Sequence, residues 1–269
     1  MLDSITFGQY VDVPSSVHRL DPRFKILALI ASIVFIFLAG NFVTLGFVTA
    51  FTLMVLLISR VPLKMYLKNL KVILPVIIFT AIINMFYAGE GVTLVDWWIF
   101  HITTGGIKRA VFMALRVVLL ILISAVLTYT TTPNDLTDAI ERLCSPLKFI
   151  GLGSVVHMLA MMMTIALRFI PTLIEETQKI MNAQKARGAS FEEGNLMQRI
   201  KALIPILIPL LISSIRRAYE LAEAMECRCY NGGKGKQRMK QFRLKWGDAA
   251  AAALVVLFCG GVIAINIFF

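Results

Sequence analysis

The sequence has few charged residues: only 16% of its 269 residues are Asp, Glu, Lys or Arg, whereas soluble domains average roughly 25%. Its hydrophobic fraction is 58%, and its mean hydropathy is +0.78. One soluble core cannot hide so much apolar surface from water, which argues against a soluble enzyme. The same composition excludes intrinsic disorder. We therefore expect an integral membrane protein.

Residue types that carry out chemistry are also scarce and scattered. The three histidines, His18, His101 and His157, fall on different predicted segments and form no metal or Cys/His catalytic group. The pair Cys227-x-Cys229 has no second such pair and no nearby histidine, so we expect reduced thiols and no bound metal. The predicted spans contain no carboxylate, the usual mark of a proton or sodium path.

A nucleotide site is absent as well. The run 232–236 is rich in glycine and lysine, but a phosphate-binding loop requires glycine where Tyr230 stands and Ser or Thr where Gln237 stands. A flexible basic linker near anionic lipid explains this run better. We therefore expect that this chain binds no ATP, no metal and no other cofactor.

The net charge of +11 is unevenly distributed along the chain. Of the 27 basic residues, 17 lie between Pro133 and Asp248, together with 11 of the 16 acids. Because basic residues favour the cytoplasmic side, this segment is predicted to be a cytoplasmic module. The predicted domains are a membrane region with four spans (1–132), the module (133–240) and a last span (241–269).

Long uncharged runs predict about five membrane-spanning helices. Residues 26–59 would form a helix of about 51 Å, too long for a hydrocarbon core of about 30 Å, so Gly40-Asn41 is predicted to divide them. Further spans are expected at 72–88, from about 110 to 132, and at 249–269. Basic flanks put the N-terminus in the cytoplasm and the C-terminus outside.

Two other features of the membrane region are less regular. Residues 89–106, with Trp97-Trp98, are predicted to form an outer loop with an aromatic anchor. Arg116 falls within a predicted span, where it either extends to the interface or faces the bundle. Pro75 is expected in the first turn of the third span, where proline costs little.

Within the module, two long helical patterns run over 155–186 and 196–229, and each ends near an arginine. Their apolar portions, 151–167 and 203–214, are predicted to lie at or under the inner leaflet, because spanning would place basic neighbours outside. The expected fold is therefore all-α, with long amphipathic helices in the cytoplasmic module.

Four stretches are similar, in order, to signatures of one family of membrane proteins. They are His18-Arg19-Leu20-Asp21-Pro22-Arg23-x-Lys25, Thr131-Thr132-Pro133-x-Asp135-Leu136, Ala186-Arg187-Gly188 and Cys227-Arg228-Cys229. Over essentially its full length the chain resembles the transmembrane coupling subunit, EcfT, of energy-coupling factor (ECF) transporters. The last stretch departs from the family's Ala-Arg-Gly pattern on both sides of its arginine.

The resemblance implies a non-catalytic subunit of an ATP-driven importer in a prokaryotic cell membrane. Two ABC-type ATPase partners would bind ATP and magnesium, and a substrate-binding membrane subunit (S component) would capture a vitamin or other micronutrient. The motifs at 186–188 and 227–229 would couple this chain to the ATPases. Nucleic acid is not an expected partner, and the lipid bilayer is.

Four methionines, Met158, Met161, Met162 and Met163, lie in one apolar stretch. They are either core residues or an adaptable contact surface for the substrate-binding subunit, since thioether side chains repack easily. Two other functions stay open from the sequence: a membrane-embedded enzyme with its active site in the cytoplasmic module, and a stand-alone secondary transporter.

Overall fold

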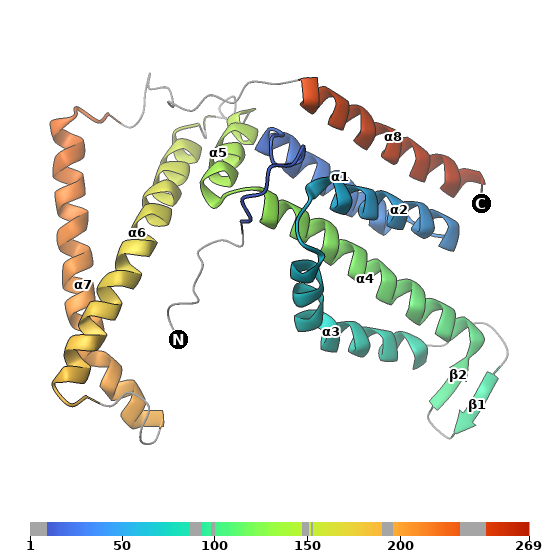
Figure 1. Cartoon of the computed structure of the whole chain (residues 1–269), viewed down its shortest axis with the longest axis horizontal. Helices are drawn as coiled ribbons and strands as arrows, with labels where there is room; N and C mark the ends of the chain where they lie inside the picture. The colour runs from blue at the N-terminus through green and yellow to red at the C-terminus, as the bar shows by residue number, and fades with distance from the viewer. Residues whose placement is uncertain are drawn as a thin grey trace. The chain divides into compact units, whose positions relative to one another are not determined.

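The computed structural model describes residues 10–86, 93–97, 100–146, 151, 153–189, 196–231 and 246–268. The basic run 232–236 and Trp98 lie outside these residues. The described residues form eight helices and one two-stranded hairpin (Figure 1). The elements, in chain order, are α1 (Pro22–Leu38), α2 (Phe42–Ser59), α3 (Leu63–Phe86), β1 (Thr93–Trp97), β2 (Phe100–Thr103), α4 (Thr104–Thr130), α5 (Pro133–Leu143), α6 (Gly153–Ala186), α7 (Leu196–Cys227) and α8 (Trp246–Phe268).

The predicted all-α class is confirmed, and the division of residues 26–59 is correct. The helix breaks between Leu38 and Phe42, at the predicted glycine and asparagine. The start of α1 follows from local chemistry: Pro22 is its first residue, and the Asp21 carboxylate accepts a hydrogen bond of 3.0 Å from the Arg23 backbone N–H. The predicted outer loop differs in one respect, because strands β1 and β2 pair antiparallel within it.

Five of the described helices are long and apolar enough to cross a membrane, judged by length and composition: α2, α3, α4, α6 and α8. This set differs from the predicted one by a single exchange, since it includes α6 in place of α1. With 17 residues, α1 lies at the lower limit for a span. The uncharged apolar stretch of α6 lies in its N-terminal half, and Glu175, Glu176 and Lys179 interrupt the apolar residues of its C-terminal half.

The position predicted for Pro75 is wrong. Helix α3 begins at Leu63, so Pro75 lies in its interior rather than in its first turn. The three lysines that precede the apolar run, Lys64, Lys68 and Lys71, belong to the same helix. Proline removes a backbone N–H from the helix and bends it, and α3 changes direction partway along its length (Figure 1).

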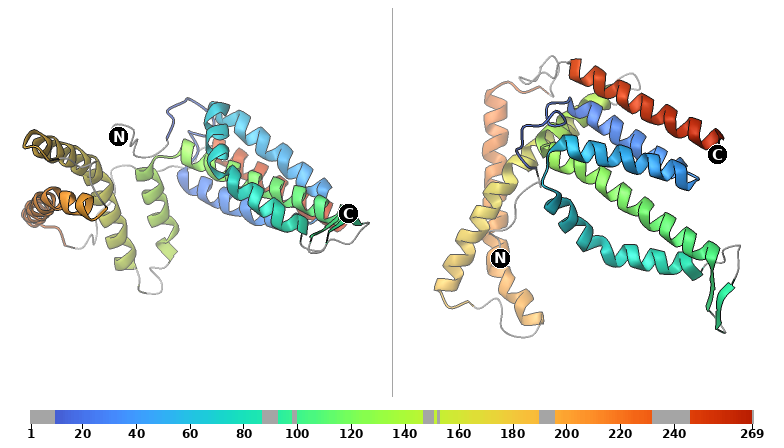
Figure 2. Two further views of the ribbon diagram at one scale, coloured as in Figure 1. Left: turned by 90° about the horizontal axis from the view of Figure 1, so that it is seen from below. Right: turned by 45° about the vertical axis from the view of Figure 1, so that its right-hand side comes forward.

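The chain separates into two compact units, and the membrane unit holds the described parts of 10–136 and 246–268. Its centre is a bundle in which α1 and α2 each contact both α4 and α8, and α3 packs along α4 (Figure 2). One core cluster fills the half of this membrane bundle where α1 ends and α2 begins. Its buried members are Ile36, Ala39, Leu45, Val48, Leu119, Ile123, Phe258 and Val262.

The second unit holds the described residues of 137–231. Helices α6 and α7 pack against each other within it. The His157 imidazole on α6 lies 2.8 Å from the Glu141 carboxylate on α5, which fixes α5 to the first turns of α6. This unit contains every residue of the two predicted coupling motifs and the four methionines.

Candidate functional site

The two long helices of the second unit end in the same backbone structure. At the end of α6, the Arg187 N–H donates to the Gln184 carbonyl, and the Gly188 N–H donates to Lys185 over 3.0 Å. The Ala189 N–H then reaches back to Gln184, also over 3.0 Å. Gly188 has a φ of +86°, the left-handed conformation that this type of helix cap requires.

The end of α7 repeats this pattern with a different sequence. The Arg228 N–H donates to the Met225 carbonyl over 3.2 Å, and the Cys229 N–H donates to Glu226 over 2.8 Å. The Tyr230 N–H returns to Met225 over 3.0 Å. Cys229 takes the left-handed position with a φ of +52°, although it carries a side chain that disfavours it. The departure of this motif from Ala-Arg-Gly therefore leaves the backbone of the cap unchanged.

Both arginines are exposed, and so are the residues that flank them in the two motifs: Ala186, Gly188, Cys227 and Cys229. The C-terminal ends of α6 and α7 lie at opposite ends of the helix pair (Figure 1). A guanidinium has five donors in a rigid fork, so each end can bind a carboxylate or a group of carbonyls on a partner. We call Arg187 and Arg228 the arginine tips.

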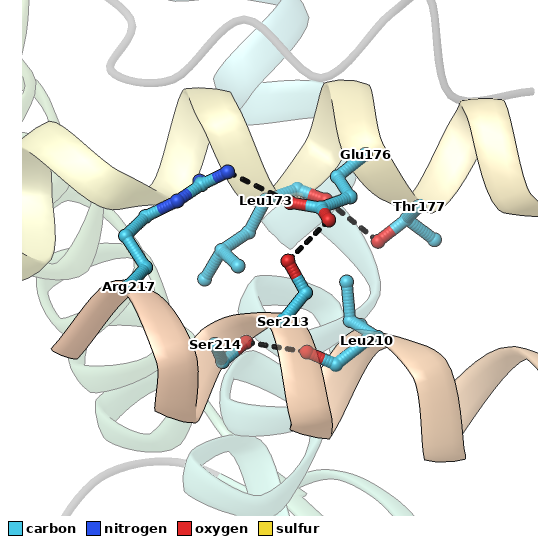
Figure 3. Close-up of polar contacts among 7 residues, drawn as sticks. All are labelled: Leu173, Glu176, Thr177, Leu210, Ser213, Ser214 and Arg217. Atoms are coloured by element: carbon cyan, nitrogen blue, oxygen red, sulfur yellow. Dashed lines mark hydrogen bonds and ion pairs between the residues drawn. The ribbon is translucent and has the colours of Figure 1, made fainter. Parts of the chain in front are cut away.

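A polar contact fixes the point where α6 and α7 cross (Figure 3). Glu176 of α6 accepts a hydrogen bond from the Ser213 hydroxyl and a second one, of 3.0 Å, from the Arg217 guanidinium; both donors belong to α7. The side chains of Glu176 and Arg217 are 24% and 30% exposed, so this ion pair is only partly screened by water. We call these three residues the crossing contact.

The crossing contact lies equally far from both arginine tips. Glu176 precedes Arg187 by eleven residues, and Arg217 precedes Arg228 by eleven residues. The helix segment between the crossing contact and each arginine tip, which we call an arm, is about 16 Å long at 1.5 Å per residue. Glu176 on α6 and Arg217 on α7 thus occupy equivalent positions relative to the ends of their helices, and these two positions are in contact. Sequence reasoning missed this contact, and the equal spacing of an acid and a base from the two tips was the signal available.

The four methionines do not share one environment. Met158, Met162 and Met163 are each about half exposed, and Met161 is less exposed than the other three. Beside them on α6, Ala160 is buried. Three of the four thioether side chains are thus accessible on this chain, which keeps them available for a partner.

A second group of polar residues includes Asp21 and Lys25 of the first signature stretch. The Lys25 ammonium donates to the Thr130 carbonyl at the end of α4, over 2.9 Å, and the Asp21 backbone N–H donates to the Asp248 carboxylate, over 2.9 Å. All four residues are buried. We call this group the polar clamp, because it joins the start of α1 to the end of α4 and the start of α8. Its partners lie more than 100 residues apart in sequence, so no local pattern reveals it.

Arg116 faces the bundle rather than the membrane interface. Its guanidinium donates to the carbonyl of Ala39, the residue that caps the C-terminus of α1, and lies 4.8 Å from the centroid of the Phe112 ring. A cation at a helix C-terminus is favourable, because it meets the negative end of the helix dipole. The role that the sequence left open for Arg116 is therefore the joining of α4 to α1.

Among the described residues, no group of three or more His, Cys, Asp or Glu side chains could hold a metal ion. All four cysteines are free thiols. The two cysteines that flank Arg228 are exposed.

Several apolar helices of spanning length, joined to a unit of two long helices with arginine ends, define a multi-pass membrane protein. Comparison with known proteins identifies its family. The family model described as CbiQ, cobalt transport protein, matches residues 14–240. The chain belongs to the family of energy-coupling factor transporter transmembrane proteins, EcfT, and is a transmembrane component of this transport system.

Three relatives illustrate the extent of the similarity, and each is named energy-coupling factor transporter transmembrane protein EcfT. The protein of Ruminiclostridium cellulolyticum is 49% identical over 98% of this chain and 97% of its own length. That of Brevibacillus brevis is 48% identical over 96% of each chain. That of Bacillus subtilis is 44% identical over 100% of this chain and 99% of its own. The predicted family and the predicted transport function are confirmed, and the enzyme and secondary-transporter alternatives do not fit.

Proposed function

We propose that this chain transmits ATP-driven motion from two ABC-type ATPase subunits to a substrate-binding membrane subunit, for uptake of a vitamin or other micronutrient. The observation that carries the proposal is the matched pair of arginine tips. Each tip ends a long helix in the same cap, and each lies eleven residues from one crossing contact. Two equivalent tips suit two ATPase partners of the same kind.

The crossing contact gives the helix pair its mechanical property. A continuous helix resists bending, so a displacement at one tip moves the crossing point instead of being absorbed along the arm. Because Glu176 bonds to both Ser213 and Arg217, the two helices cannot slide past one another without breaking charged hydrogen bonds. Movement of the ATPases would therefore reach both helices together.

The division of labour follows from what the chain offers. In this proposal the ATPases bind ATP and magnesium, and this chain supplies binding surfaces without taking part in catalysis. The motif residues Ala186, Arg187 and Gly188 meet one ATPase, and Cys227, Arg228 and Cys229 meet the other. Exposed Met158, Met162 and Met163, with Met161 beside them, form part of the surface for the substrate-binding subunit. The N-terminus and both arginine tips are cytoplasmic. The apolar half of α6, although long enough to span, lies at or under the inner leaflet in this proposal.

Alanine substitution of the arginine tips tests the proposal. Arg187→Ala and Arg228→Ala should each reduce uptake in cells, and the double variant should nearly abolish it. Truncating one partner of a buried charged contact costs roughly 2–5 kcal/mol. The ATPases should co-purify less with the double variant, or hydrolyse ATP without transport. Arg→Lys at each tip should rescue only partly, because lysine has no bidentate fork.

The matched control is Arg216→Ala, which removes an exposed arginine from the same helix α7 and should change uptake little. Normal uptake and normal ATPase recruitment by the double variant would refute the coupling role of the tips. Family membership would be unaffected by that result, since it rests on the sequence.

A further inference from the structure

A cavity of about 420 Å³ lies inside the membrane bundle, between α1, α2, α4 and α8. Its volume is within the range of pockets that hold small molecules, about 300–1,000 Å³. It occupies the end of the bundle where α1 and α8 begin and where α2 and α4 end, the same end as the polar clamp. The side chains of Leu29, Phe51, Ile123 and Leu254 form much of its wall.

The cavity reaches the same depth on three helices. On α1 its lining runs from Phe24 to Ser32, on α4 from Thr130 to Ile123, and on α8 from Gly247 to Val255. At 1.5 Å per residue, these stretches correspond to about 10–12 Å each. The space is therefore a slot that runs parallel to the helices from one end of the bundle, rather than a void at its centre.

Small residues of α8 create the slot. Gly247, Ala250 and Ala251 line it, and a Cβ added at Gly247 would have no atom within 4 Å. The other end of α8 packs closely, because a Cβ added at Gly261 would lie 2.9 Å from the Phe47 ring. One helix thus leaves space at one end of the bundle and fills it at the other.

The chemistry of the slot changes along its length. Apart from Ser32, whose hydroxyl donates to the Ala28 carbonyl, its deep part is lined by aliphatic and aromatic side chains, while Ser16, Lys25 and Thr130 lie at its polar end. The Lys25 ammonium is held by the carbonyls of Thr130 and His18. Arg19 is exposed in the same segment that supplies Ser16 and Leu20 to the lining. The carboxylates of Asp21, Asp135 and Asp248 act on the Lys25 ammonium and balance its charge, so the exposed Arg19 is the cation offered to an occupant with an apolar tail and an anionic head.

We propose that this bundle cavity binds one acyl chain of an anionic phospholipid, whose phosphate lies near Arg19 at the polar end. Lipid is the solvent around a membrane bundle, so an acyl chain is the apolar group available to fill the slot. Burial of the chain contributes about 0.8 kcal/mol per CH₂ relative to water, and far less relative to the bilayer. The headgroup contact and the shape of the slot must therefore supply the selectivity.

The test measures lipid that stays bound to the full chain purified with its transporter partners. The complex is stripped of lipid in detergent, exposed to equal amounts of phosphatidylglycerol and phosphatidylcholine, and examined by native mass spectrometry. We expect one phosphatidylglycerol per chain to be retained. Combined Ala250→Leu and Ala251→Leu substitutions should lower retention at least tenfold, because leucine side chains fill the slot.

The matched control is Ala253→Leu, the same change at an exposed position of α8, which should leave retention unaltered. Ser32→Leu fills the slot from α1 and should lower retention as the α8 variant does. Agreement between variants on two helices would exclude a folding defect of one helix as the cause. Arg19→Gln should reduce the preference for phosphatidylglycerol over phosphatidylcholine several-fold. Equal retention by the filled variants and the control, equal retention of the two lipids by the unaltered chain, or capture of a partner's helix in the slot would each overturn the proposal.

Discussion

The membrane bundle and the α6–α7 pair hold together in different ways. The bundle has a buried apolar core and a polar clamp whose four members are all buried. In the described part of 137–231, the only buried hydrophobic residues are Ala139, Ala160 and Ile206. The bundle is therefore stabilised by its own side chains, whereas the α6–α7 pair has the crossing contact and a thin apolar seam.

This difference leaves a large apolar surface exposed on the helix pair. Helix α7 exposes a long row of large apolar side chains, a pattern that marks interaction surfaces. Its members include Ile200, Leu203, Ile204, Leu207, Ile208, Leu211, Ile212 and Ile215, each about half exposed. A pair of helices that buries so little by itself gains most of its stability by packing against lipid or other proteins.

Breaking the polar clamp should have the largest effect on the bundle. Lys25→Met retains the length of the side chain and removes its donors, which leaves the Thr130 carbonyl buried without its cation. We expect the free energy of unfolding to fall by about 3 kcal/mol. Thermal unfolding of the purified complex measures this. Lys64→Met, the same change at an exposed position of α3, is the control, and an equal loss in both variants would contradict a special role for Lys25.

Breaking the crossing contact should affect the helix pair and spare the bundle. Glu176→Ala removes the acceptor of both Ser213 and Arg217, with an expected cost of about 2 kcal/mol. The amount of protein in the membrane should stay normal, while substrate transported per ATP hydrolysed should fall. Arg217→Ala should match it, and Arg216→Ala should not. Unchanged coupling in Glu176→Ala would show that packing alone fixes the crossing.

The smallest effects are expected at the two helix caps, and their signs should differ. Gly188→Ala places a side chain at a φ of +86° and should destabilise the end of α6 by about 1 kcal/mol. Cys229→Gly relieves the strain of a positive φ on α7 and should therefore stabilise the end of that helix. The gain should be small, because glycine also gives the unfolded chain more conformational freedom, which opposes folding. Amide hydrogen exchange of peptides covering the two ends measures both changes.

Cys227→Gly serves as the control for the caps, because residue 227 is the last residue of α7 and not a left-handed position. It should weaken protection where Cys229→Gly strengthens it. Equal responses at the two cysteines would mean that the positive φ at Cys229 carries no strain.

Single-residue patterns predicted four of the five helices of spanning length and the C-terminal ends of α6 and α7, but they missed α6 as a helix of spanning length. The division at Gly40-Asn41 followed from the thickness of a bilayer, and Gly188 after Arg187 indicated a C-terminal cap. The start of α3 was predicted too late because Lys64, Lys68 and Lys71 were interpreted as flanking charges. Lysines can belong to the first turns of a spanning helix, since their long stems reach the interface.

Contacts between distant segments were beyond local patterns. Nothing near Lys25 in the sequence indicates that its ammonium bonds to Thr130, 105 residues later. The equal spacing of Glu176 and Arg217 from the two tips is visible in the sequence, but it acquires meaning only once the two helices are known to pair. The cap at Cys229 was obscured for another reason, because cysteine rarely adopts a positive φ. For the contacts of Lys25 and Glu176, the partner becomes evident only when the helices are placed side by side.

The polar clamp also has a consequence for how such chains can change over evolution. The segment between α4 and α8 begins after Thr130 and ends before Trp246. Residues at both boundaries bond to the start of α1, Thr130 to Lys25 and Asp248, in the first turn of α8, to Asp21. The membrane bundle therefore fixes the two boundaries of this segment with its own buried polar groups. The segment is thus an exchangeable insert: a chimera joined at 131 and 245 could carry a relative's helix pair, with its own partner preference, on an unaltered membrane anchor.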